Sequence, residues 1–109
     1  MRHLLTNEIP LVEFLFELAA IPLEVGSLTV QPMADGGMGS LAISPLDSGR
    51  RFGSQVAECH FHDEDGTPVS VTLNVDQNGD PFEIDFWRVD FSPTVAWPSR
   101  ASITAGPPN

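Results

Sequence analysis

Residues 55–91 read QVAECHFHDEDGTPVSVTLNVDQNGDPFEIDFWRVDF, and apolar and polar side chains alternate in three runs of this stretch. The runs cover residues 55–61, 69–75 and 82–86. Alternation with a period of two over such lengths is typical of strands that bury one face. We therefore predict three consecutive antiparallel strands that form the centre of a sheet.

The two short connections predict how these strands pair. Glu64-Asp65-Gly66 suits a three-residue loop with a left-handed glycine, and Asn78-Gly79 suits a two-residue type I′ turn. The first would bring together Phe61 and Val69, Cys59 and Val71, and Ala57 and Leu73. The second would bring together Val75 and Phe82, Leu73 and Ile84, and Val71 and Phe86. Every pair is apolar, and a one-residue slip would turn all of them to the other face, so both turns support one register.

The same register gathers polar side chains on the opposite face of the sheet. The expected rows are Glu58–Thr72–Asp85, His60–Ser70–Trp87 and Asn74–Glu83. Trp87 is the exception, because it is a large apolar side chain among acidic ones, the composition of a binding hot spot for a basic partner. A structural alternative is that the chain after Phe91 folds over Trp87. The candidate partner-binding residues are therefore Trp87, Glu58, His60, Glu83 and Asp85.

Composition narrows the class of partner. The chain has 109 residues, 41% of them hydrophobic, which is enough for one modest core. Its formal net charge of −10 opposes binding to nucleic acid or anionic lipid and favours a basic protein. Glu8, Glu13 and Glu17 interrupt the apolar start of the chain, so we expect no signal peptide. No stretch reaches the roughly 18 apolar residues of a membrane span.

The single cysteine and the histidines offer other chemical candidates. Cys59 is predicted to face the core, and a lone buried thiol is typical of a reducing compartment, so we expect a cytoplasmic protein. Glu58, His60 and His62 project from one strand face, and two imidazoles with a carboxylate can bind a transition metal. This metal site is an alternative to partner binding. We predict no cofactor, and no spacing of nucleophile and base matches a catalytic signature.

The remaining segments complete an α+β fold. Thr6 to Ala20 is predicted to be a helix, with Thr6 as its N-cap and an apolar stripe toward the sheet. Ser27 to Met33 and Leu41 to Ser44 are predicted strands, joined by a glycine-rich hairpin loop whose amides could alternatively bind a small anion. We expect one N-terminal helix packed on an antiparallel, mostly meandering sheet of about five strands. This single domain would span residues 1–98, with residues 99–109 as an irregular, frayed tail.

Two sequence boxes resemble those of a family of small uncharacterised bacterial domains. The first is Asp35-Gly-Gly-Met-Gly-Ser40. The second is Leu73-Asn-x-Asp-x-x-Gly-x-x-Phe-Glu-x-Asp-x-Trp87, followed by Asp90-Phe91-Ser-Pro and Trp97-Pro98. With the leading helix, the resemblance covers roughly residues 2 to 98. It implies a bacterial, single-domain setting and carries no known activity.

These observations favour a non-enzymatic protein-binding module. Small size, net charge −10 and the lack of a catalytic spacing are typical of an immunity protein or antitoxin-like inhibitor that masks a basic surface on its target. A metal-binding or metal-sensing domain that uses Glu58, His60 and His62 stays one alternative. A homodimer, in which the polar face or the edge strand pairs with itself, is another.

Overall fold

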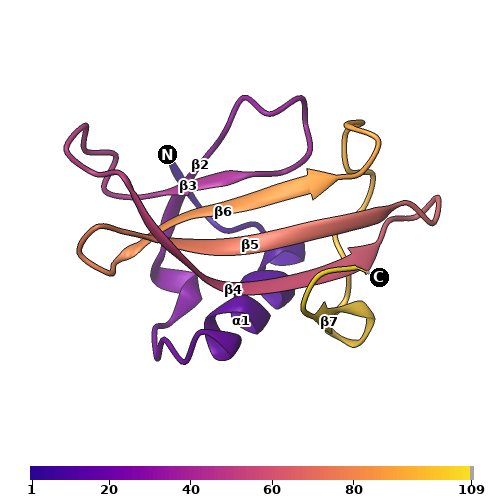
Figure 1. The fold of residues 1–109 in the computed structure, drawn as a ribbon, viewed down its shortest axis with the longest axis horizontal. Helices are drawn as coiled ribbons and strands as arrows, with labels where there is room; N and C mark the ends of the chain where they lie inside the picture. Colours follow the sequence, from indigo (N-terminus) through magenta and orange to yellow (C-terminus); the bar gives the residue numbers. More distant parts are fainter. Residues whose placement is uncertain (109) are drawn as a thin grey trace.

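The computed structural model describes residues 1–108, in which one α-helix packs on a seven-stranded antiparallel sheet. The helix, α1, spans Ile9–Leu18. The strands are β1 (Arg2–His3), β2 (Thr29–Pro32), β3 (Leu41–Ile43), β4 (Phe52–His62), β5 (Pro68–Asp76), β6 (Pro81–Arg88) and β7 (Thr104–Ala105). Their order is β1-β2-β3-β6-β5-β4-β7, and α1 covers one face of the sheet against β4 and β5 (Figure 1). The α+β class is confirmed, whereas the predicted number of about five strands was too low.

The register predicted for the three central strands is confirmed except at Val75, which does not pair with Phe82. On β4 and β5 the paired residues include Phe61 with Val69, Cys59 with Val71 and Ala57 with Leu73. On β5 and β6 they include Val71 with Phe86 and Leu73 with Ile84. These apolar side chains form the core together with Leu11, Val12, Leu15 and Phe16 of α1. Burial of that apolar surface is the main force that holds the helix on the sheet.

The turn between β5 and β6 differs from the predicted two-residue form. The amide of Asp76 donates to the carbonyl of Asp80, so residues 77–79 form a three-residue loop, in which Gly79 alone has a positive φ. Val75 then lies opposite Pro81, and a bulge at Phe82 restores the predicted register from Asn74 onward. The Asp76 carboxylate favours the longer loop, because it accepts hydrogen bonds from the amides of Asn78 and Asp80.

Both ends of the chain contribute strands that the sequence did not predict. β1 pairs with β2, and β7 pairs with β4 at Cys59 and His60. The segment predicted as an irregular tail therefore adds to the sheet in its described part, and Ile103 is buried beside the core. Strands of two residues are too short to show an alternating pattern, which explains why they were not predicted.

The helix begins later than predicted. Thr6–Glu8 form a turn of 3₁₀ helix before α1, and Thr6 is not the N-cap. The carboxylate of Glu8 instead accepts the amide of Leu5 at 2.8 Å and pairs with Arg2. Glu8 thus binds back to the residue that precedes the turn, a different contact from the N-cap hydrogen bond predicted for Thr6. The helix ends before Ala20, which has a left-handed φ of 56°. None of the helices in residues 1–108 has the length and the apolar run needed to cross a membrane.

A buried ion-pair cluster lies at the end of β6, around Arg88. Arg88 occupies an inward-facing position opposite Val69 and is 3% exposed. Its guanidinium binds the carboxylates of Asp63, Asp65 and Asp90. Asp63 also accepts the amides of Val95 and Ala96, so one buried carboxylate joins the β4–β5 turn, β6 and the segment after it. Trp97, in the segment after β6, packs on Phe86 with ring centroids 4.5 Å apart.

We predict that Asp63→Asn destabilises the fold by about 3 kcal/mol, because of the three carboxylates that bind the buried Arg88 charge it removes the one that is fully buried. Urea unfolding followed by far-UV circular dichroism measures the change. Glu64→Gln is the control, since Glu64 is exposed in the same turn and its loss should cost less than about 0.5 kcal/mol. Equal effects of the two substitutions would contradict the role of Asp63.

Candidate partner-binding face

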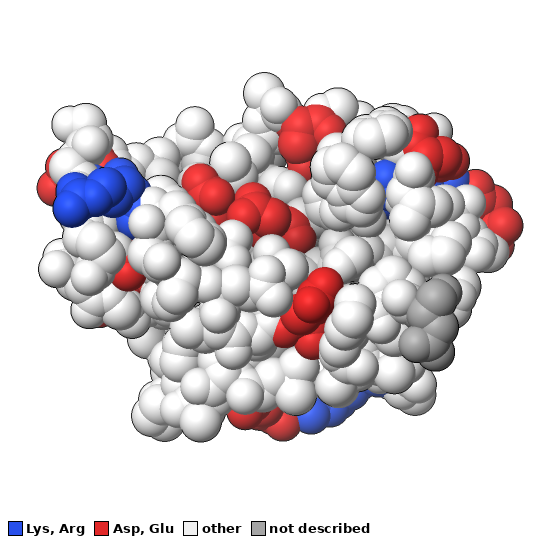
Figure 2. All heavy atoms as spheres, viewed as in Figure 1, with Lys and Arg blue, Asp and Glu red and all other residues white. Residues whose placement is uncertain are grey.

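The face of the sheet turned away from α1 carries the polar rows that the sequence predicts. Glu58 lies opposite Thr72, which lies opposite Asp85. The neighbouring rows are His60–Ser70–Trp87 and Asn74–Glu83. All five candidate residues therefore share this outer face of β4, β5 and β6, which we call the acidic face. Acidic atoms cross the middle of the sheet in Figure 2, and basic atoms lie only toward its margins.

Glu83 and Asp85 form an interacting pair of carboxyl groups on β6. They are two residues apart and face the same side of the strand. Partial burial raises the pKa of both groups, and the charge of Asp85 raises the pKa of Glu83 further. The Asn74 side-chain amide donates to Asp85 at 2.5 Å and works in the opposite direction, by stabilising the charged form. The charged form of either group is therefore opposed by burial, and that of Glu83 also by the neighbouring carboxylate of Asp85.

Two side-chain hydrogen bonds hold the β4 side of the acidic face. The Ser70 hydroxyl donates to Glu58 at 3.1 Å across the β4–β5 pair. The Nδ1 atom of His60 lies 2.8 Å from the carbonyl oxygen of Gly106, and it donates there because a carbonyl can only accept. The segment after β7 thus fixes the His60 ring. This contact was not predicted, because no strand was expected in that segment.

Trp87 is open to solvent at the end of the acidic face. Its side chain is 53% exposed and contacts Phe91, which is 61% exposed, with ring centroids 4.8 Å apart in an edge-to-face arrangement. Trp97 packs on Phe86 instead of covering Trp87. Phe91 keeps a left-handed φ of 64°, which sets its ring beside the indole. The two rings form an exposed aromatic pair next to carboxylates.

Within residues 1–108 the carboxylates of the acidic face have no basic side chain as an ion-pair partner. Four of the five arginines bind acidic residues elsewhere. These pairs are Arg2–Glu8, Arg50–Asp76, Arg88–Asp63 and Arg100–Glu17. Arg50 also donates to the carbonyls of Ile43, Pro45 and Pro81. These contacts give it a structural role, in which it does not neutralise the acidic face. The acidic face is left with uncompensated negative charge.

The metal alternative finds no support in this geometry. Nowhere in the described chain do three or more His, Cys, Asp or Glu side chains gather in a way that could hold a metal ion, the set of Glu58, His60 and His62 included. The ring centroids of His60 and His62 are 6.2 Å apart and nearly perpendicular, and the Nδ1 atom of His60 is engaged by Gly106. Cys59 is fully buried, which raises the pKa of its thiol to about 12.

The glycine-rich loop between β2 and β3 is a hairpin connection, as its principal interpretation predicted. Gly36, Gly37 and Gly39 all have positive φ. The Asp35 carboxylate accepts the amides of Met38 and Ser40, so these two amides are not free for an anion. Asp35 also contributes to the acidic field, because its charge raises the pKa of Asp85. Sequence reasoning missed this neighbour, since nothing in the sequence placed β3 beside β6.

A family model described as a domain of unknown function, DUF6984, matches residues 1–98. The chain belongs to this family. The match covers the acidic face, the aromatic pair and Trp97, whereas β7 lies beyond it. No curated protein and no solved structure matches the chain. The family therefore agrees with the predicted resemblance to small uncharacterised domains and adds no activity.

We predict that Glu83→Gln stabilises the protein at pH 7 by less than about 1 kcal/mol. Folding raises the pKa of Glu83, so its neutral form is the one that the fold favours, and its charge opposes folding above that pKa. As the pH falls through the raised pKa, the wild-type residue becomes neutral and the difference disappears. Melting temperatures of both proteins between pH 4 and pH 8 measure this. A constant difference across that range would contradict the explanation.

Proposed function

We propose that the acidic face, with the aromatic pair Trp87 and Phe91 at its end, binds a basic partner protein. The observation that carries the proposal is the position of Trp87: a half-exposed indole shares one surface with carboxylates that have no basic partner among residues 1–108. Hot spots of protein interfaces are enriched in tryptophan, and charged residues around them steer a partner of opposite charge. A module of this kind acts as an inhibitor by covering a cationic surface.

The carboxylates of the acidic face reduce the free energy of unfolding, which supports a binding role for this face over a merely solvated surface. Glu83 and Asp85 keep raised pKa values, which means that their charges oppose the fold at neutral pH. The chain neutralises other carboxylates with well-placed arginines, as at Asp63 and Asp76. Surface charges that oppose folding and have no partner within the molecule are typical of functional sites. A basic partner would supply the missing counterions.

The same charge argues against a second copy of the chain as the partner at this face. Two copies would bring Glu58, Glu83 and Asp85 against their own equivalents, with no basic side chain between them. Like charges across an interface cost several kcal/mol. We therefore favour a partner with a chemically different surface.

We predict that Trp87→Ala weakens binding of the basic partner at least about thirtyfold, the effect of losing a central hot-spot residue. The wild-type protein, immobilised and exposed to host-cell lysate, should retain a basic protein that a salt gradient releases. Binding of that purified protein to wild type and Trp87→Ala is then measured by calorimetry. The removal of two charges in Glu58→Gln/Asp85→Asn should weaken binding and flatten its salt dependence.

The matched control is Glu13→Gln/Glu24→Gln, which removes two charges on the helix side of the molecule. Binding of the basic partner should be nearly the same for this variant as for the wild type. If both charge variants weaken binding equally, or if Trp87→Ala binds as tightly as the wild type, the acidic face is not the contact surface.

A further inference from the structure

A cavity of about 340 Å³ opens on the helix side of the molecule, between α1 and the segment that follows it. Phe16 and Val25, both buried, form its floor, and Leu23, which is 40% exposed, forms part of its wall. Glu13, Glu17 and Glu24 line its rim. This volume lies within the range of small-ligand sites. The cavity is separate from the acidic face, because α1 covers the opposite side of the sheet.

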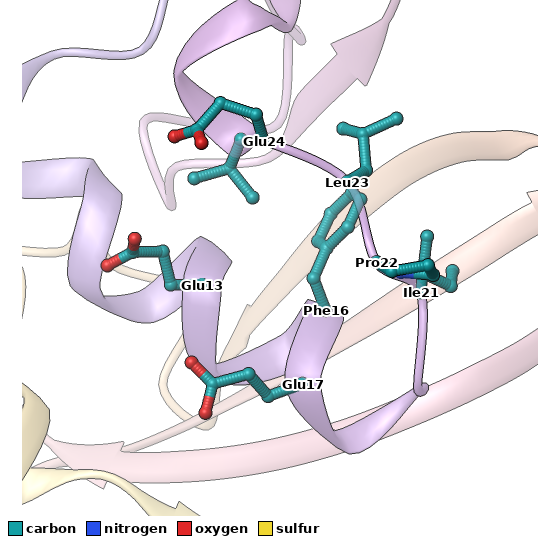
Figure 3. Close-up of a pocket in the computed structure, with 8 residues that line it drawn as sticks. Glu13, Phe16, Glu17, Ile21, Pro22, Leu23 and Glu24 are labelled. Atoms are coloured by element: carbon teal, nitrogen blue, oxygen red, sulfur yellow. The ribbon is translucent and has the colours of Figure 1, made fainter.

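The polar and apolar walls of this cavity are on different sides. Figure 3 shows the carboxylates of Glu13, Glu17 and Glu24 along one side and the apolar segment of Ile21, Pro22 and Leu23 on the other, with the Phe16 ring between them. Glu13 and Glu17 are one helical turn apart on α1, and Glu24 approaches from the segment that follows. A ligand that matches these walls has a cationic head and an apolar stem.

The rim already binds one guanidinium that the chain itself provides. Arg100 contacts Glu17 through two nitrogen–oxygen pairs of 2.9 and 2.6 Å, the two-point geometry that a guanidinium makes with a carboxylate. Its carbon Cζ lies 5.4 Å from the centre of the Phe14 ring. Among residues 1–108, Glu13 and Glu24 make no ion pair. Two rim carboxylates are therefore free to accept a second cation.

We propose that this cavity binds an alkylguanidinium group, as carried by an arginine side chain or by a free guanidino compound. The head group binds Glu13 and Glu24, and the alkyl stem lies over Phe16 toward Leu23. A guanidinium suits the site because its planar fork pairs with carboxylates and its faces are weakly hydrated. Arg100 stays on Glu17, so the ligand enters without breaking the existing ion pair. This site is independent of the proposed function of the acidic face.

The test is a titration of the ¹⁵N-labelled full chain with N-butylguanidinium, followed by amide chemical shifts. We expect saturable shifts at Phe16, Leu23 and Val25, with affinity at least about tenfold lower in Glu13→Gln/Glu24→Gln. The matched control is Glu58→Gln/Asp85→Asn, which loses two charges from the acidic face and should bind the compound as the wild type does. The amide spectra also show that each variant is folded.

Titrations with two different ligands identify the source of the guanidinium group. N-butylguanidinium and the peptide acetyl-Gly-Arg-Gly-amide are compared at equal concentration. Binding of both at the same residues assigns the site to an arginine side chain, whereas binding of the free compound alone assigns it to a small molecule. Shifts that do not saturate, or that the two charge variants weaken equally, would overturn the proposal, because general attraction to an acidic protein would explain them.

Discussion

The register of β4, β5 and β6 is the constraint on which the rest of the structure depends. Side chains alternate between the faces of a strand, so the pairing that places Val71, Leu73 and Ile84 under α1 also places Thr72 and Asp85 on the outside. A slip by one residue would bury the carboxylates and expose the core. The acidic face is therefore the geometrical complement of the hydrophobic core, and neither can form without the other.

Two buried aspartates hold this register at the hairpin turns. Asp63 begins the turn after β4, and Asp76 begins the turn after β5. Each accepts backbone amides of its own turn, and each binds an arginine, Arg88 or Arg50. The Asp76 corner also needs Gly53, because any Cβ there would lie 2.1 Å from the carbonyl oxygen of Asp76. The arginines that could have neutralised the acidic face are thus used to fix the turns.

The sequence predicted those features that depend on repeated local patterns. Alternation over runs 55–61, 69–75 and 82–86 identified the central strands, and their apolar matches identified the register and the outward position of Trp87. The features it missed depend on single long-range contacts. Arg88 faces inward only because Asp63, Asp65 and Asp90 converge on it.

The short strands and the details of the turns could not be predicted from these patterns, for a related reason. β1 and β7 have two residues each, so no periodicity precedes their pairing. The longer loop at residues 77–79 depends on hydrogen bonds to the Asp76 carboxylate, which competed with the favoured Asn-Gly turn. The cavity beside α1 arises where the chain turns back after Ala20, a tertiary feature without a sequence motif.

Contact mapping tests the central claim, a binding role for the acidic face, most directly. The ¹⁵N-labelled chain would be mixed with the basic protein that it captures, and the loss of amide and indole signal intensity would be recorded residue by residue. Our account predicts losses along the outward residues of β4, β5 and β6 and at the Trp87 indole, while α1 is unchanged. Losses centred on α1, with the Trp87 indole signal intact, would contradict it.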